Sequence, residues 1–183
     1  MKSILALDVS KTACGWAFGL PGDKPLSGVT SFGGNTATDD EVWRNGMVWL
    51  NERMAFLKPD IVAIEAAIMS SAPGQGGFTN PHSQALLLGL QAVLRTVVKA
   101  RLPGAAVLVA PSTARKTFCG RGQFAKGEAK PAVQQEAMRR GWLDHVSLDP
   151  DKADALCLWC HMAAQQLPDL AFNPKRRPAP AGV

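Results

Sequence analysis

Residues 60–65, which read DIVAIE, decide the fold class. This apolar run is too short for a helix and is typical of a strand that is buried on both faces of a sheet. A capping box at 38–41 begins a helix that stops before Pro59, and Asn80 with Pro81 opens a long helix to about Arg101. A buried strand between two helices indicates an α/β domain.

The rest of the chain extends this sheet. Apolar runs at 3–8, 14–20 and 28–32 are joined by short turns, so we expect an antiparallel meander. We expect a last strand at 105–110, then helices over 128–141 and from Asp149 to about Leu167. This order predicts one domain, residues 1–168, with a five-stranded mixed sheet and helices on both faces. The tail, 169–183, is basic and proline-rich, which favours disorder.

Acidic side chains end two of these strands and begin the last helix. Asp8 closes the first strand and Glu65 the fourth, so their carboxylates could lie side by side. Asp151 and Asp154 are three residues apart and should project from one side of the first helical turn. Taken singly, such acids also serve as solvated strand ends or as favourable charges at a helix start. Four converging carboxylates favour Mg²⁺ or Mn²⁺, and two such ions about 4 Å apart support phosphodiester hydrolysis.

Positive charge is concentrated in the second half of the chain. Residues 1–94 carry 6 Lys and Arg against 8 Asp and Glu, whereas residues 95–183 carry 14 against 7. The densest basic block, 95–130, contains a single acid, Glu128. This distribution predicts a polyanionic partner such as nucleic acid, and a solvated basic face is the alternative.

Other patterns narrow the class of protein. No apolar run approaches the roughly 20 residues of a membrane span, and no signal peptide is apparent, so we expect a cytoplasmic protein without a membrane partner. Cys157, Cys160 and His161 match a haem-attachment pattern, but they fall inside an expected helix and lack an export signal, so we expect no haem. The helix that begins at Asn80 has more apolar residues than one core face needs, which favours a second buried contact such as a dimer interface.

Three motifs, in this order, resemble those of RuvC-type Holliday junction resolvases. They are ILALD at 4–8 with GWA at 15–17, IVAIE at 61–65, and DKADAL at 151–156. The basic segment also resembles that of the family, with APS at 110–112, KTFCGRG at 116–122 and AK at 125–126. The resemblance runs from about residue 3 to residue 165. The loop after Glu65 is longer and richer in glycine than in the cellular enzymes, so the resemblance leaves open which aromatic residue enters the junction, and a phage-type member of the family is one possibility.

The resemblance implies an RNase H-like fold. It also implies a homodimer that makes paired, metal-dependent nicks in four-way or branched DNA during recombination and repair. Carried over by motif, the catalytic metal ligands are Asp8, Glu65, Asp151 and Asp154, which would hold two Mg²⁺ ions that Mn²⁺ can replace. Arg115 and Lys126 match basic positions that contact DNA in the family. The expected DNA-binding residues are Arg115, Lys116, Arg121, Lys126 and Lys130, with Phe78 as the candidate to enter the junction.

Three alternative functions remain open. An RNase H-like nuclease that acts on RNA or on an RNA–DNA hybrid would use the same acids with a different substrate groove. An actin-like or sugar-kinase-like phosphate-binding domain is the second, because DVSKT at 8–12 resembles the first loop of those proteins. The chain is too short for their two lobes and lacks their second glycine-rich loop. The third is an inactive DNA-binding module, against which the presence of all four acids argues.

Overall fold

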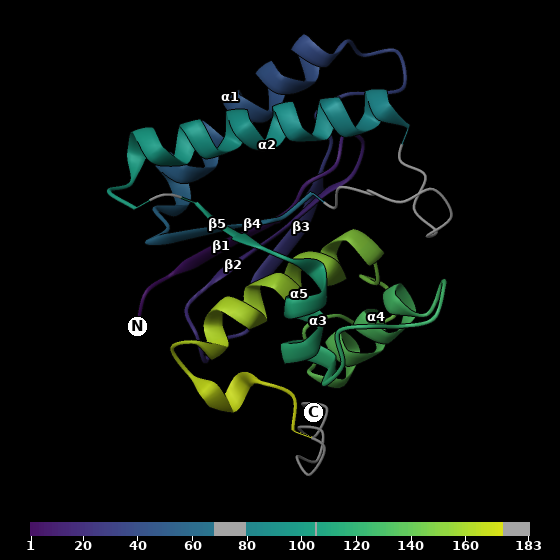
Figure 1. The fold of residues 1–183 in the computed structure, drawn as a ribbon. Helices are drawn as coiled ribbons and strands as arrows, with labels where there is room; N and C mark the ends of the chain where they lie inside the picture. The colour runs from purple at the N-terminus through teal and green to yellow at the C-terminus, as the bar shows by residue number, and fades with distance from the viewer. Residues whose placement is uncertain (68–79, 105, 174–183) are drawn as a thin grey trace.

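A five-stranded mixed sheet forms the centre of the protein, for which a computed structural model describes residues 1–67, 80–104 and 106–173 (Figure 1). The strands are arranged in the order β3-β2-β1-β4-β5. Their bounds are Ile4–Asp8 for β1, Cys14–Gly19 for β2, Leu26–Thr30 for β3, Ile61–Glu65 for β4 and Val107–Val109 for β5. β1, β2 and β3 form an antiparallel meander, whereas β1, β4 and β5 run parallel. The sheet expected from the sequence is thereby confirmed.

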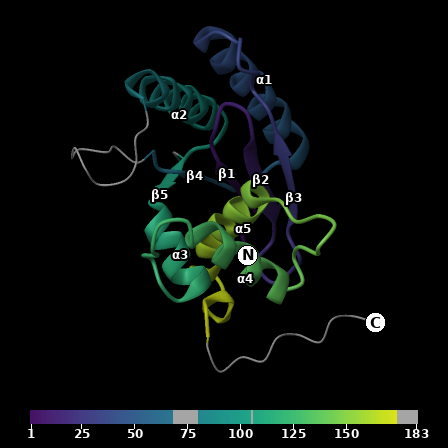
Figure 2. The same ribbon diagram turned by 90° about the vertical axis from the view of Figure 1, so that its right-hand side faces the viewer.

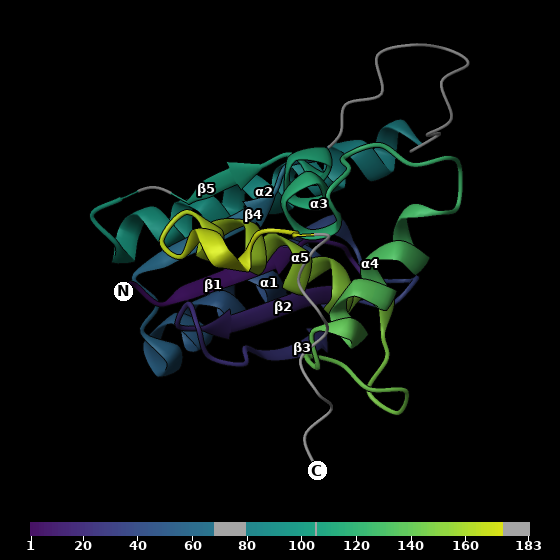
Figure 3. The ribbon, with the colours of Figure 1, turned by 90° about the horizontal axis from the view of Figure 1, so that it is seen from below.

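Helices cover both faces of the sheet (Figure 2). α1 (Asp39–Leu57) and α2 (Pro81–Arg101) lie on one face, and α3 (Pro111–Cys119), α4 (Ala129–Arg139) and α5 (Pro150–Ala164) on the other. Seen from the face that α3, α4 and α5 cover, α5 lies across the middle of the sheet (Figure 3). None of the helices in the described ranges is long and apolar enough to cross a membrane.

The central strands are buried on both sides because successive side chains point to opposite faces. Along β1, Ile4 and Ala6 pack toward α5, whereas Leu5 and Leu7 pack toward α1 and α2. All four side chains are fully buried. This two-sided burial is what continuous apolar runs indicate in a sheet covered by two helical layers.

α2 finds its second apolar contact within the chain. Leu86, Leu90, Leu94 and Val98 recur at every fourth position and are buried against the sheet and α1. Gly46 of α1 leaves room for Leu90, and the Trp43 indole N–H of α1 donates to the Leu86 carbonyl at 3.0 Å. Packing on the sheet and on α1 uses one side of the apolar surface of α2, whereas Leu88 remains 39 % exposed. The dimer interface expected for this helix stays a prediction.

α3 lies in the basic segment for which the sequence analysis expected no helix. Pro111 directly follows the strand expected at 105–110 and is the first residue of α3, where a missing N–H costs nothing. Ala114 and Phe118 lie one turn apart and are buried, and Gly120 ends the helix at φ 79°. Tertiary packing of this short apolar face fixes a helix whose sequence is otherwise basic and glycine-punctuated.

The chain continues to pack after α5. A 3₁₀ helix, η1 (Pro168–Leu170), follows it, and the Phe172 N–H donates to the Thr117 carbonyl of α3 at 2.7 Å. These contacts fall within the stretch 169–183 that the sequence analysis assigned to the tail. Residues 174–183 of that stretch lie outside the described residues.

Candidate active site

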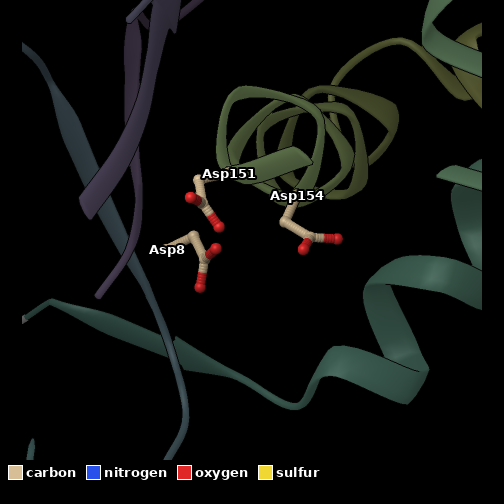
Figure 4. Close-up of side chains that lie close together, drawn as sticks. All are labelled: Asp8, Asp151 and Asp154. Carbon is tan, nitrogen blue, oxygen red and sulfur yellow. The ribbon is translucent and has the colours of Figure 1, made fainter. Parts of the chain in front are cut away.

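Carboxylates from β1 and α5 converge at one edge of the sheet (Figure 4). Asp8 is the last residue of β1, and Asp151 and Asp154 lie in the first turns of α5. One carboxylate oxygen from each of the three residues lies within 4.8 Å of the others. Asp154 is only 7 % exposed, so its charge is held away from bulk water.

The start of α5 explains why two of these acids face the sheet. Asp149 is the N-cap, and its Oδ1 accepts the backbone N–H groups of Asp151 and Lys152 at 2.9 and 3.1 Å. Pro150 follows as the first helical residue. Because Asp149 caps the helix, the side chains of Asp151 and Asp154 are not needed for that purpose and converge with Asp8.

Gly15 allows α5 to approach the sheet at this point. It pairs with Asp8 in the β1–β2 register, and a Cβ built on it would overlap the backbone carbonyl of Asp151. Only glycine leaves room for this contact between backbones. Gly15 belongs to the GWA motif at 15–17, but the sequence does not show that α5 contacts the sheet there.

Glu65 lies beside this group but is not one of the three residues whose oxygens converge within 4.8 Å. It ends β4, which pairs in parallel with β1 so that Leu7 faces Ile64 and the two strands end at the same edge. The Gln91 side-chain amide of α2 donates to the Glu65 backbone carbonyl at 2.8 Å. This hydrogen bond fixes the backbone at the end of β4, and the Glu65 carboxylate lies close enough to the site for its charge to raise the pKa of Asp8.

Burial and mutual repulsion disfavour the charged forms of these acids. Burial raises the pKa of Asp8 well above its usual value, and the charges of Glu65, Asp154 and Asp151 raise it further. The pKa of Glu65 is raised to about 7 by burial and then by Asp154. Burial also raises the pKa of Asp154, although Lys130 and Arg115 act in the opposite direction. The site holds more negative charge than its surroundings neutralise.

Two cations from the basic segment face the acids. Lys130, in the first turn of α4, places Nζ 3.1 Å from Asp151 Oδ1 and 3.9 Å from Asp154 Oδ2. Arg115 of α3 lies close enough to lower the pKa values of Glu65 and Asp154. The ion pairs of Lys130 were not foreseen, because 20 residues separate it from Asp151 in the sequence.

The other expected DNA-binding residues lie on and after α3. Lys116 is exposed on α3, and Lys126 is exposed in the segment between α3 and α4. Arg121 is exposed and stacks its guanidinium 4.3 Å from the ring centre of Phe124. Phe78 lies outside the described residues.

The acidic group fits a hard divalent cation. Its converging donors are carboxylate oxygens alone, which is the ligand chemistry of Mg²⁺ and Mn²⁺. Burial raises the pKa values of Asp8 and Asp154 and so disfavours their charged forms, which a divalent cation at the same oxygens would stabilise.

Comparison with solved structures identifies the architecture. The Thermus thermophilus RuvC structure superposes with a TM-score of 0.64 at 16 % sequence identity, covering 91 % of this chain and 96 % of that one. The chain has the RuvC fold. The RNase H-like fold expected from the sequence is thereby confirmed.

Two further structures share this RuvC fold. T. thermophilus RuvC in complex with a Holliday junction substrate gives a TM-score of 0.63 at 16 % identity, with 93 % of this chain and 98 % of that one covered. The yeast mitochondrial Holliday junction resolvase Ydc2 gives a TM-score of 0.62 at 12 % identity, with 90 % of this chain and 78 % of that one covered. Neither the protein-family models nor the curated proteins include a match to the sequence.

Proposed function

We propose that this chain is a metal-dependent endonuclease that resolves four-way or branched DNA junctions. The observation that carries the proposal is the convergence of Asp8, Asp151 and Asp154 at a sheet edge within a RuvC fold. Among the proteins of similar structure, T. thermophilus RuvC binds a Holliday junction substrate and Ydc2 is a Holliday junction resolvase. Such an activity would serve DNA recombination and repair, in keeping with the cytoplasmic location expected from the sequence.

Asp8, Asp151 and Asp154, with Glu65 beside them, would hold the metal. Two Mg²⁺ ions, or Mn²⁺ in their place, would activate the attacking water and stabilise the leaving oxygen of the phosphodiester. The buried β1 and α5 backbones fix three of the carboxylates relative to one another, which limits the reorganisation required during the reaction.

The basic residues beside the acids would bind the DNA backbone. Arg115 and Lys130 face the acidic group, and Lys116, Arg121 and Lys126 continue the positive surface along α3 and the segment before α4. Phosphate contacts by Lys and Arg give affinity without reading sequence, which suits an enzyme that selects a branched shape. Phe78 remains the proposed residue at the junction centre.

We propose further that the enzyme acts as a homodimer. Two nicks in strands of like polarity need two active sites, and this chain supplies one. Large apolar side chains of α1 and α2 remain solvent-exposed in the single chain, among them Met47, Val48, Phe56 and Leu88. Their burial against a second copy would provide an apolar interface.

A panel of labelled substrates tests the substrate class. With Mg²⁺, the protein should nick a four-way DNA junction at least about 100-fold faster than a linear duplex of the same sequence, as expected for a junction-selective enzyme. An RNA–DNA hybrid of that sequence is the third substrate. Equal or faster cleavage of the hybrid would replace the junction resolvase with an RNase H-like nuclease.

A further inference from the structure

Lys130 is held by the same carboxylates that would bind metal. Its Nζ lies 3.1 Å from Asp151 Oδ1 and 3.9 Å from Asp154 Oδ2. Burial works against the charged lysine, but the hydrogen bond to Asp151 and the charges of Asp151, Asp154 and Asp8 raise its pKa. The ammonium group is therefore a fixed positive charge against the acidic group.

The local structure of α4 gives no other reason for this placement. A cation in the first turn of a helix is opposed by the positive end of the helix dipole. The first turn of α4 contains no acid, and its N-cap, Glu128, makes no side-chain capping bond. The Lys130 side chain is 56 % exposed, so packing does not hold it either. Its attraction to Asp151 and Asp154 is the interaction that fixes it.

We propose that Lys130 is a resident counter-ion of the acidic group and competes with the divalent metal for Asp151 and Asp154. The inference rests on the proposed function, because it concerns the same metal site. An ammonium group and a metal ion need the same carboxylate oxygens, so each weakens the binding of the other, and the coupling is reciprocal. Because its side chain is solvent-accessible, Lys130 can leave the acids without opening the core.

The balance of charge supports displacement of Lys130 by the metal, rather than binding of both to the carboxylates at the same time. Asp8, Glu65, Asp151 and Asp154 carry four negative charges when ionised, and Lys130 with Arg115 supplies two positive ones. Two divalent cations neutralise the four carboxylates without any lysine. Once the acids are neutralised, they no longer hold the ammonium group, which can turn to a DNA phosphate beside the site.

Direct measurement of Mg²⁺ binding by calorimetry, on the full chain at pH 8 and without DNA, tests the proposal. Lys130→Met should bind Mg²⁺ about two- to fivefold more tightly than the wild type, the range that removal of one partly exposed ion-pair partner gives. Lys130→Arg keeps the charge and should bind like the wild type. Lys99→Met removes an exposed cation of α2 that has no ion pair with the acids among the described residues, and it should also leave Mg²⁺ binding unchanged.

Thermal unfolding of the same variants gives a second readout. In chelator, Lys130→Met should unfold at a lower temperature than the wild type, and saturating Mg²⁺ should raise its Tm by more than it raises that of the wild type. Equal or weaker Mg²⁺ affinity in Lys130→Met, with wild-type binding intact, would overturn the counter-ion role and leave the metal centre standing. Absence of Mg²⁺ binding in every variant would instead overturn the metal centre, and the counter-ion role with it.

Discussion

At the scale of single residues, the four acids owe their character to where they lie. An aspartate at a strand end or in a first helical turn is common and is usually solvated. Here burial and mutual repulsion raise the pKa values of Asp8, Glu65 and Asp154. Perturbed pKa values of this kind cluster at functional sites. Charging these acids without a bound cation costs free energy, so the stability of the metal-free protein should depend on pH.

Without metal, the protein should become less stable as the pH rises from 5 to 8. The pKa of Glu65 is about 7 in the folded protein against 4.5 in the unfolded chain, so the folded state binds this proton more tightly. The stabilisation is complete below pH 4.5 and is lost as the pH rises through 7. Thermal unfolding in chelator measures this loss. Between pH 5 and pH 8, the Tm of Glu65→Gln should fall by several degrees less than the Tm of the wild type.

Glu52→Gln is the matched control for that measurement, because Glu52 is exposed on α1. It should reproduce the wild-type dependence of Tm on pH. If Glu65→Gln and Glu52→Gln follow the same curve, the pKa of Glu65 is not raised by burial in the way described.

The sequence predicted a convergence of four acids but not what surrounds them. The oxygens of Asp8, Asp151 and Asp154 lie within 4.8 Å of one another, whereas Glu65 lies beside this group and not within it. The role of Gly15 depends on a contact between two backbones 136 residues apart, and the ion pairs of Lys130 depend on how α4 packs on α5. A pattern among neighbouring residues in the sequence does not show which distant residues come into contact.

At the scale of elements, the close approach of α5 to β1 and β2 forms the site. Helix ends with strong local signals were predicted to within about a residue, as for the capping box at Thr38 that begins α1. α3 was missed because it is only nine residues long, most of its residues are polar or basic, and its start, Pro111, also suits the end of a strand. Contacts with α5 and α4 decide its structure.

Gly15→Ala should push the start of α5 off the sheet. The added methyl group would overlap the Asp151 carbonyl, and overpacking of this kind costs roughly 2–3 kcal/mol of unfolding free energy. The displaced helix should also weaken Mg²⁺ binding, measured by calorimetry. Gly34→Ala is the control, because a Cβ there meets no atom within 4 Å and should change neither quantity. Wild-type Mg²⁺ affinity in Gly15→Ala would contradict this account of the site.

At the scale of the whole molecule, charge is divided between two halves. The first 94 residues have a net charge of −2 and the remaining residues +7, and the basic helices α3 and α4 lie on the same face of the sheet as α5. A nucleic acid bound at the acidic edge would therefore meet positive surface from one side. The salt dependence of DNA binding measures the contact between this positive surface and the nucleic acid.

Arg115→Ala and Lys126→Ala should each weaken binding to a four-way junction and reduce its salt dependence. Each lost phosphate contact lowers the slope of log K against log salt concentration by about 0.9. Binding is measured by fluorescence anisotropy with Ca²⁺, over a range of salt concentrations. Lys58→Ala, on the opposite helical layer at the end of α1, should leave the slope unchanged. An unchanged slope in Arg115→Ala or Lys126→Ala would remove that residue from the DNA surface.

The homodimer predicts a solution mass of twice 19.5 kDa by sedimentation equilibrium. Leu88→Glu places a charge among the exposed apolar residues of α1 and α2 and should shift the protein to the monomer. Val146→Glu alters another exposed apolar residue, between α4 and α5, and should leave the dimer intact. A monomeric wild type, or a dimeric Leu88→Glu, would contradict the proposed interface.

The most direct test of the metal-dependent nuclease measures cleavage and binding of one labelled four-way junction in the same samples. With Mg²⁺, the wild type and Asp40→Asn, which alters an exposed acid of α1, should cleave at equal rates, and chelator should stop both. Asp154→Asn should bind the junction but cleave it at least about 100-fold more slowly, because one of the converging carboxylates is lost. Cleavage by Asp154→Asn at the wild-type rate, or cleavage in chelator, would contradict the account.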